Sequence, residues 1–288
     1  MNSRRFIRIL AAAIVAIGAA FVVGHWRGGT SEPEGGQLLP QLNGQMSEVT
    51  SVTIRKGTAL PAVMLHKQAD RWTIAQRADY PVDIAKLRKL LQDLAGARVL
   101  EEKTSDPSNY HALGVESPDA PDAIGAEIKI VTPATTQSLI VGKPSAGGNF
   151  VRFSQQARGL LVAPGLSPDA EPRDWIDARL LDLQAAQVQQ IEVKPAKGAT
   201  VKRKDTDFGA FADLSALDVA PADSVDFKAA TTATITLTDG AVITLTGVTV
   251  QDKHWLTVAS SRDAGLNDKA HGRAFEISAS RYDSIFKL

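Results

Sequence analysis

A change in the spacing of apolar residues near the start of the folded region constrains the fold most. Val52 and Ile54 alternate with polar residues, and after an intervening Gly and Pro the residues Val63 and Leu65 share one face, with Met64 on the other. Such alternation is typical of strands with one buried face, because successive side chains of a strand point to opposite sides. We therefore predict two consecutive strands here.

A third predicted strand, Trp72–Ile74, leads into a helix. Beyond it the apolar residues recur every three or four positions, which is the spacing of one face of a helix. Asp83 can cap the helix N-terminus by accepting from free backbone N–H groups, and Gly96 is a typical stop. The predicted apolar face consists of Ile84, Leu87, Leu90, Leu91 and Leu94.

Short alternating runs with glycine-rich turns follow the helix, and they are typical of an antiparallel meander. Residues 174–181 are then predicted to form a short helix, with Asp174 or Asp177 as its N-cap. The predicted strands of the meander are 126–131, 137–141, 149–153 and 159–163.

In the last third of the chain the pattern restarts. The apolar residues of 188–193 match those of 49–54 position for position. The helix is weak in this second copy, since 211–219 offers only Leu214 and Leu217 as an apolar face. We predict two related lobes from this repeat, with chance similarity among short strands as the alternative. The later strands of the second copy are 234–238, 241–247, 254–258 and 273–277.

The N-terminus combines three early arginines with an apolar run from Phe6 to Val23. This length meets the lower bound of about 17–25 residues for a membrane-spanning helix, and Trp26 suits the opposite interface. A cleaved signal peptide, with Gly18-Ala19-Ala20 near its cleavage site, is the alternative. We favour an uncleaved anchor over residues 1–28, which contacts the inner membrane as a transmembrane helix.

The arginines predict that the N-terminus is cytoplasmic and the globular part periplasmic, as in a single-pass protein of the bacterial inner membrane. Residues 29–46 are rich in Gly, Pro, Ser, Glu and Gln, so we predict a flexible tether there. The remaining predicted domains are a first α+β lobe at 47–186 and a second, mostly β lobe at 187–288.

Composition excludes several classes of function. Thirty-two basic and 32 acidic residues leave a formal net charge of +0, which argues against nucleic acid as a partner. The chain has no cysteine, so disulfides, thiol nucleophiles and thiolate metal sites are excluded.

Known catalytic and metal-binding motifs are not apparent. The sequence Gly142-Lys143-Pro144-Ser145 is similar to the end of a P-loop, but Pro144 stands where Ser or Thr should follow the lysine, so a hairpin turn is favoured. There is no Gly-x-Ser-x-Gly elbow. The histidines show neither H-x-x-x-H nor H-E-x-x-H spacing. They are His25, His66, His111, His254 and His271.

Carboxylates and aromatic residues support a weaker alternative. Asp174, Asp177 and Asp182 form the best carboxylate cluster, and glycoside hydrolysis uses such pairs, although capping and surface solvation also explain them. Aromatic side chains can stack on sugars or peptides, but they more often complete small cores. We therefore predict no catalytic, cofactor-binding or metal-binding residue and no cofactor. The aromatic residues concerned are Trp72, Tyr80, Tyr110, Trp175 and Trp255.

Several of these segments together resemble a known bacterial family. In order, they are Arg71-Trp72, Tyr80-Pro81-Val82-Asp83, Leu113-Gly114-Val115 with Pro118, and Leu139-Ile140-Val141-Gly142. This order resembles the membrane-anchored domain-of-unknown-function family numbered four-three-four-zero, over most of the chain after about Val49. The resemblance supplies no catalytic residues. It implies an association with gliding-motility-type ABC transporter subunits, because family members are often encoded beside them.

These observations lead to one prediction and one alternative. We predict an α+β fold of mostly antiparallel β meanders with one main amphipathic helix, two related lobes and an N-terminal transmembrane helix. The predicted function is that of a non-enzymatic, membrane-anchored periplasmic accessory or scaffold protein that binds an envelope partner, with an ABC-type exporter as the candidate. The alternative is an anchored envelope enzyme, or a glycan- or peptide-binding module that uses a cleft between the lobes.

Overall fold

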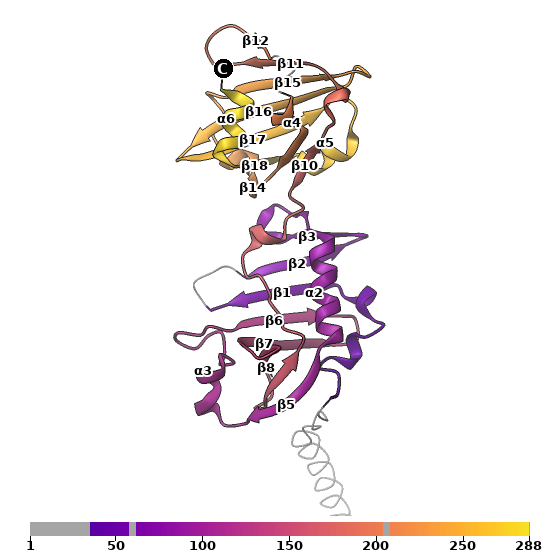
Figure 1. The fold of residues 1–288 in the computed structure, drawn as a ribbon, viewed down its shortest axis with the longest axis vertical. Coiled ribbons are helices and arrows are strands. Elements are labelled where there is room, and N and C mark those ends of the chain that lie inside the picture. The colour runs from indigo at the N-terminus through magenta and orange to yellow at the C-terminus, as the bar shows by residue number, and fades with distance from the viewer. Residues whose placement is uncertain (1–34, 58–61, 204–207, 288) are drawn as a thin grey trace, which may run out of the picture.

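The computed structural model describes residues 35–57, 62–203 and 208–287. They form antiparallel sheets with a few helices, arranged as two lobes stacked end to end (Figure 1). The predicted α+β class, dominated by antiparallel strands, is confirmed. The predicted anchor at 1–28 lies outside the described residues. Within the described ranges, no helix has the length and apolar character needed to cross a membrane.

The first lobe is built on a nine-stranded sheet of order β4-β3-β2-β1-β6-β7-β8-β9-β5. Val52 and Ile54, like Val63 and Leu65, are fully buried on one face, as their alternation predicts. The strands are β1 (Ser51–Lys56), β2 (Val63–Gln68), β3 (Arg71–Ile74), β4 (Tyr80–Pro81), β5 (Arg98–Thr104), β6 (Ala126–Val131), β7 (Thr136–Ser145), β8 (Gly148–Phe153) and β9 (Gly159–Ala163).

Helix α2 (Ile84–Gly96) covers the buried face of this sheet. The Asp83 carboxylate accepts from the Lys86 backbone N–H at 3.0 Å, which confirms the predicted N-cap. Leu87, Leu90, Leu91 and Leu94 are buried as predicted, whereas Ile84 remains 42% exposed. Gly96 is the last helical residue and the C-cap is Ala97, so the predicted stop at Gly96 was one residue early.

The opposite face of the first sheet is partly covered by the segment around η4 (Pro107–Asn109) and α3 (Tyr110–Leu113). Buried Arg152 of β8 donates from Nε to the Val115 carbonyl at 2.8 Å. Its guanidinium lies 4.6 Å from the centre of the Tyr110 ring. The sheet is therefore buried on both faces near β8.

The segment from residue 35 onward packs against the first lobe. Leu38, Leu39 and Leu42 are buried in its core. The prediction of a flexible tether over 29–46 was therefore wrong for the part that the structure describes. The prediction was based on the polar average composition of 29–46 and took no account of these leucines, whose burial favours folding. Two short 3₁₀ helices lie here, η1 (Pro40–Leu42) and η2 (Met46–Glu48).

The second lobe contains a seven-stranded sheet of order β12-β11-β15-β16-β17-β18-β14. This order repeats β2-β1-β6-β7-β8-β9-β5 of the first lobe. Ile191 and Val193 of β11 are fully buried, at the positions that Val52 and Ile54 hold in β1. The strands are β11 (Val188–Lys194), β12 (Val201–Lys202), β14 (Asp218–Pro221), β15 (Thr231–Leu237), β16 (Val242–Val250), β17 (Lys253–Ser260) and β18 (Arg273–Ile277).

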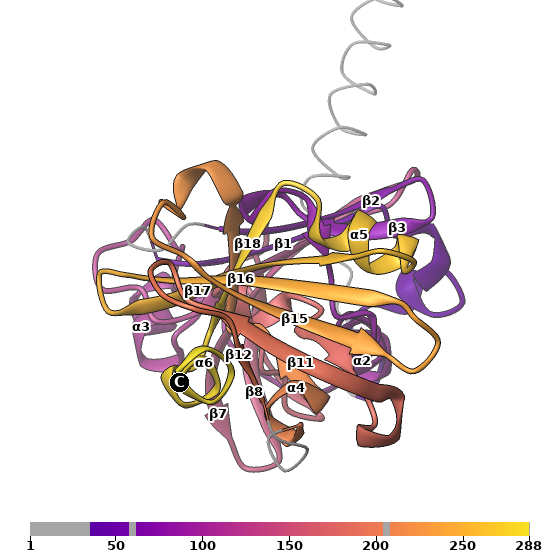
Figure 2. The ribbon, with the colours of Figure 1, turned by 90° about the horizontal axis from the view of Figure 1, so that it is seen from above.

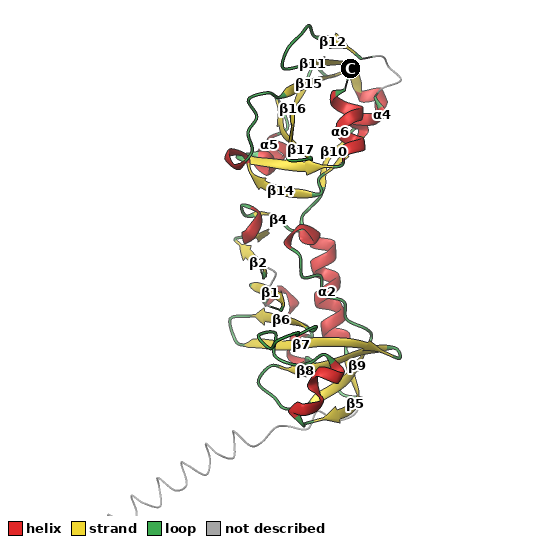
Figure 3. Ribbon diagram, turned by 90° about the vertical axis from the view of Figure 1, so that its left-hand side faces the viewer, coloured by secondary structure: helices red, strands yellow, loops and turns green. Residues whose placement is uncertain are grey.

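The weak helix predicted over 211–219 is not formed. The helix α4 (Gly209–Ala212) ends early, and β13 (Asp213–Ser215) and β14 follow. The C-terminal helix α6 (Ala279–Phe286) packs beside α4, and both lie on the side of the lobe that α2 occupies in the first lobe (Figure 3). The Phe286 ring fits against Gly247, where a Cβ atom would lie 2.3 Å from it. The C-terminal helix α6 thus covers the face of the sheet that a helix over 211–219 was predicted to cover.

The segment between the lobes also differs from its prediction. Instead of a helix over 174–181 there is a 3₁₀ turn, η5 (Pro172–Trp175), with neither Asp174 nor Asp177 as its N-cap. The strand β10 (Arg179–Asp182) then pairs with β13, so the chain joins the second lobe before the predicted boundary at 187. Viewed down the stack, the second lobe lies over the first (Figure 2).

Candidate functional site

The two lobes meet through a buried aromatic contact. Tyr80 of β4 and Phe275 of β18 pack edge to face, with ring centroids 5.6 Å apart. Burial raises the pKa of Tyr80, and its hydroxyl donates to the Asp177 carbonyl at 3.0 Å. Residues of both lobes belong to one hydrophobic cluster, so the core continues through the junction.

Two arginines fix the orientation of the lobes. Arg77, at the end of η3 (Ala75–Arg77), donates from Nη2 to Asp218 Oδ2 of β14 at 3.1 Å and from Nε to Oδ1. Arg273 of β18 donates from Nη2 to the carbonyls of Ala78 and Asp79 at 2.8 and 3.2 Å. The forked contact of Arg77 with a carboxylate adds geometric specificity to its energy, so it restricts the angle between the lobes.

A polar pocket of about 590 Å³ opens beside the junction, between the β2–β3 turn and α5 (Ala264–Ala270). Two of its charged residues form an ion pair: Arg71 contacts Asp268 at 2.5 Å and lowers the pKa of that carboxyl. The donors and acceptors of the pocket suit a small polar ligand. Its lining includes Gln68, Arg71, Thr73, Asp79, Lys269 and Arg273.

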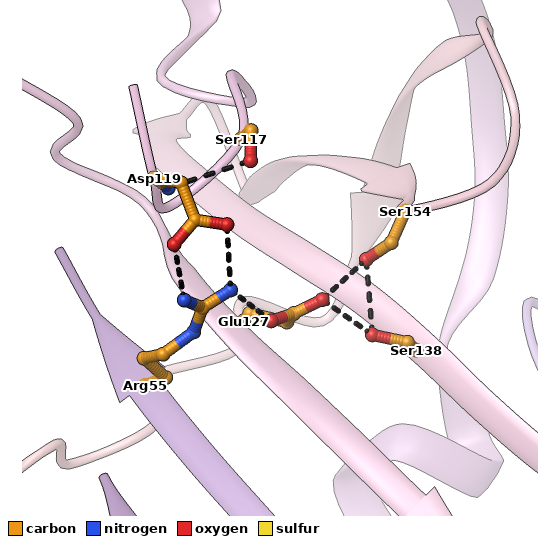
Figure 4. A network of polar contacts seen from close by, with 6 residues as sticks. All are labelled: Arg55, Ser117, Asp119, Glu127, Ser138 and Ser154. Carbon is orange, nitrogen blue, oxygen red and sulfur yellow. Dashed lines mark hydrogen bonds and ion pairs between the residues drawn. The ribbon is translucent and has the colours of Figure 1, made fainter. Parts of the chain in front are cut away.

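A polar network lies on the open face of the first sheet (Figure 4). Glu127 of β6 accepts from the hydroxyls of Ser138 and Ser154 at 2.7 and 2.8 Å. Its other oxygen accepts from Arg55 Nη2 at 3.1 Å, and Arg55 also contacts Asp119 at 2.5 Å. One carboxylate therefore joins β1, β6, β7 and the chain after β8.

The network keeps Glu127 ionised. Burial alone would raise the pKa of Glu127, but the hydrogen bonds from Ser138, Ser154 and Arg55 outweigh it and lower that pKa. An ionised carboxylate whose oxygens are held by donors is a poor general acid at neutral pH. The network is therefore better suited to holding strands together than to proton transfer.

The three aspartates of the predicted carboxylate cluster do not converge on one pocket. Asp177 contacts Lys269 of α5 at 2.7 Å, and Asp182 contacts Arg179 of its own strand at 2.9 Å. Burial raises the pKa of Asp174, although Lys86 opposes the effect. None of the three lines the junction pocket. The structure thus gives them separate environments rather than the facing pair that glycoside hydrolysis requires.

Three of the five aromatic candidates complete cores. Trp175 is buried and donates from Nε1 to the Asp169 carbonyl at 2.9 Å. Tyr110 is buried as well, and its hydroxyl donates to the Ala157 carbonyl at 2.5 Å. Tyr80 lies in the junction. Of the five, Trp72 and Trp255 are partly exposed, so these two could stack on a ligand.

The histidines are dispersed. His111 Nδ1 lies 3.3 Å from Glu116 Oε1, and His254 stacks on Tyr282 with ring centroids 4.7 Å apart. His66 lies 3.1 Å from the Thr73 hydroxyl. His271 follows α5, and His25 lies outside the described residues. In the described part of the chain, no three His, Asp or Glu residues are grouped to hold a metal ion.

The P-loop-like sequence forms the end of β7. Ser145 pairs with Gly148 across a tight turn, so the hairpin interpretation is confirmed. Lys143 donates from Nζ to the carbonyls of His111 and Ala112 at 3.1 and 3.0 Å, and it is thus occupied in holding α3.

Sequence reasoning missed both the junction and the Glu127 network. Arg77 and Asp218 are 141 positions apart, and Arg273 and Ala78 are 195 apart, so no local pattern connects them. Glu127 and Ser138 each lie at polar positions of a predicted strand, but nothing in the strand patterns singles them out as partners. Pairing them required the register of β6 on β7.

The comparison with family models identifies a family. The model described as Domain of unknown function (DUF4340) matches residues 72–226, which is more than half of the 288-residue chain. The chain belongs to the DUF4340 family. No curated protein and no solved structure shows a significant match to it.

The DUF4340 match crosses both lobes. It begins at β3, contains α2 and the connecting segment, and ends just beyond β14. Tyr80, Arg77 and Asp218 of the junction lie inside it, whereas Phe275 and Arg273 lie beyond its end. The family model therefore spans the connection between the lobes rather than one lobe alone.

Proposed function

We propose that this DUF4340 protein is a membrane-anchored periplasmic accessory or scaffold protein that binds an envelope partner, with an ABC-type exporter as the candidate. The proposal combines the apolar run from Phe6 to Val23 with the shape of the body. The end-to-end arrangement of the two lobes, fixed by a buried junction, is the observation that carries it. A stiff body held at one end is suited to reaching a partner above the membrane.

The described chain begins at the end of the body that lies away from the second lobe. Gly35 donates from its backbone N–H to the Val99 carbonyl of β5 at 2.7 Å. β5 is one edge of the first sheet, and β4, which contacts the second lobe, is the other. An anchor preceding residue 35 would hold the first lobe near the membrane and place the second lobe farther out. With strands about 4.8 Å apart, each sheet extends by roughly 30–40 Å.

The location is tested by fractionating cells that express the full-length protein. We expect it to remain in the membrane fraction after an alkaline wash. We also expect protease to cleave the body in spheroplasts, where the periplasmic side is accessible, without lysis of the inner membrane. Protection of the body in intact spheroplasts, or release by the wash, would contradict the proposal.

The junction pocket favours a second candidate function, an anchored envelope enzyme or a glycan- or peptide-binding module. Envelope oligosaccharides and short peptides are screened by their effect on the melting temperature of the protein. A ligand of the pocket should raise the melting temperature of the wild type but not of Thr73→Ala, because Thr73 lines the pocket. If no compound raises it, or the variant responds equally, this candidate fails.

A further inference from the structure

An apolar groove follows the N-terminal half of α2. It is lined by Met46 of η2, Trp72 of β3 and the α2 residues Ile84, Leu87 and Leu91, and its volume is about 390 Å³. We refer to this feature as the α2 groove. It lies on the helix side of the first sheet, away from the Glu127 network.

The α2 groove leaves apolar surface in water. Ile84 belongs to the apolar face of α2 by its spacing, yet it is 42% exposed. Trp72 and Met46 are only partly buried against the core. Apolar surface in contact with water is unfavourable relative to buried apolar surface, and contiguous patches of it commonly mark interaction sites.

A cation without a partner stands at the edge of the groove. Arg88 is exposed and lines the groove, and it has no hydrogen bond or ion pair among the described residues. The two other cations of α2 are matched: Lys86 contacts Asp169 at 2.5 Å and Lys89 contacts Asp93 at 2.7 Å. Exposed apolar surface and a positive charge without a partner among the described residues therefore lie side by side in the α2 groove.

The dimensions of the groove fit a helix. Between Ile84 and Gln92 it follows α2 over about 12 Å, which is roughly two helical turns. A helix that docks in such a groove uses anchors at positions i, i+3 or i+4, and i+7. A guanidinium such as that of Arg88 can bind a carboxylate through two parallel hydrogen bonds. It therefore favours a docked helix that has an acidic residue beside its apolar anchors.

We propose that the α2 groove binds an amphipathic helical segment of the envelope partner. The segment places two or three apolar side chains against Trp72 and Ile84 and a carboxylate against Arg88. This inference rests on the proposed function and names the surface that serves it. The other polar surfaces are less suitable, since Arg71 of the junction pocket and Glu127 of the network are already paired with charged residues of the protein.

Site-specific photo-crosslinking in native membranes tests this proposal. A photoreactive amino acid replaces Gln92 at the groove in the full-length protein. In a control it replaces Lys129, which is exposed on the other face of the first sheet. Crosslinked segments are identified by mass spectrometry. Arg88→Glu is then combined with the Gln92 probe, and Lys129→Glu serves as the matched reversal of charge.

We expect an adduct from position 92 but not from position 129. The captured segment should carry apolar residues at helical spacing and an adjacent Asp or Glu. Arg88→Glu should reduce the adduct at least tenfold, and Lys129→Glu should change it less than twofold. Equal adducts from both positions, a basic segment, or indifference to Arg88→Glu would overturn the proposal. So would capture of residues 1–34 of the same chain or of a second copy.

A general lysine crosslinker applied to the same membranes separates failure of the groove from failure of the proposed function. Recovery of envelope proteins without an adduct at position 92 would exclude the groove and leave the accessory function standing. Recovery of the protein alone by both reagents would contradict both.

Discussion

At the scale of single residues, buried polar groups determine how the strands of the first sheet are held. Arg152 donates to four backbone carbonyls, those of Val115, Phe153, Ser154 and Gln156. Burial lowers the pKa of Arg152. On the same face of the sheet, Glu127 accepts hydrogen bonds from Arg55, Ser138 and Ser154. Glu127 belongs to no recognisable motif, because its partners come from separate parts of the chain.

Glu127→Gln should destabilise the protein in a pH-dependent manner. At pH 7 the loss in free energy of unfolding should be about 1–2 kcal/mol, since hydrogen bonds to a charged group become neutral ones. The folded state lowers the pKa of Glu127 below its unfolded value of about 4.3, so the stabilisation is present above that value. It is lost as the pH falls through the folded pKa.

Urea denaturation of both proteins at pH 7 and at about pH 3.5 measures this effect. The difference between wild type and Glu127→Gln should shrink at the lower pH. Glu48→Gln is the control, because Glu48 is exposed. A difference that is the same at both pH values would show that the Glu127 charge does not contribute.

At the scale of elements, prediction succeeded where one face of an element is buried. The alternation of β1 and β2 and the capped helix α2 were predicted because burial imposes their periods on the sequence. β5 was not predicted, since Val99 is its only buried residue and an edge strand needs no alternation. The helix over 211–219 was predicted from similarity to the first lobe, but α6, from the far end of the chain, covers that face.

Two glycines test how closely the elements pack. A Cβ at Gly148 would lie 1.8 Å from the Val162 carbonyl oxygen of β9, whereas a Cβ at Gly96 would meet nothing within 4 Å. Gly148→Ala should therefore destabilise by about 3 kcal/mol or more. Gly96→Ala should stabilise by up to about 1 kcal/mol, because alanine is the better helix former.

Thermal and urea unfolding of both variants check these values. Similar stabilities for the two variants would contradict the packing of β8 on β9. A loss of stability in Gly96→Ala would contradict the open surroundings of the end of α2.

At the scale of the whole molecule, the two lobes repeat one strand order and are stacked in the same sense (Figure 1). Strand β14 forms one edge of the second sheet and lies next to the β4 edge of the first sheet. Asp218 of β14 accepts a hydrogen bond from Arg77 across this boundary. The repeat of strands could be read from the sequence because each copy has its own alternation. The junction could not, since its contacts depend on how the completed sheets meet.

Arg77→Ala should loosen the junction. Both side chains of the Arg77–Asp218 pair are largely buried, with 19% and 11% exposed, so removing the arginine should cost about 3 kcal/mol. The Arg71–Asp268 pair crosses the same junction but is 72% and 61% exposed. Arg71→Ala is therefore the matched control and should destabilise the protein much less than Arg77→Ala, because solvent screens an exposed ion pair.

Unfolding curves give both costs, and small-angle X-ray scattering shows whether the lobes separate. We expect Arg77→Ala to increase the maximum dimension or to unfold in two transitions, and Arg71→Ala to resemble the wild type. Equal effects of the two substitutions would show that the buried pair does not fix the lobes.

The central claim, that the protein binds an envelope partner, is tested most directly by a crosslinked pull-down of the full-length protein from native membranes. The recovered proteins are quantified by mass spectrometry against an unrelated single-pass membrane protein treated in the same way. The account predicts enrichment of one envelope assembly, with ABC transporter subunits as the candidate, over abundant membrane proteins. Recovery of the protein alone, or of the same proteins as the control, would contradict it.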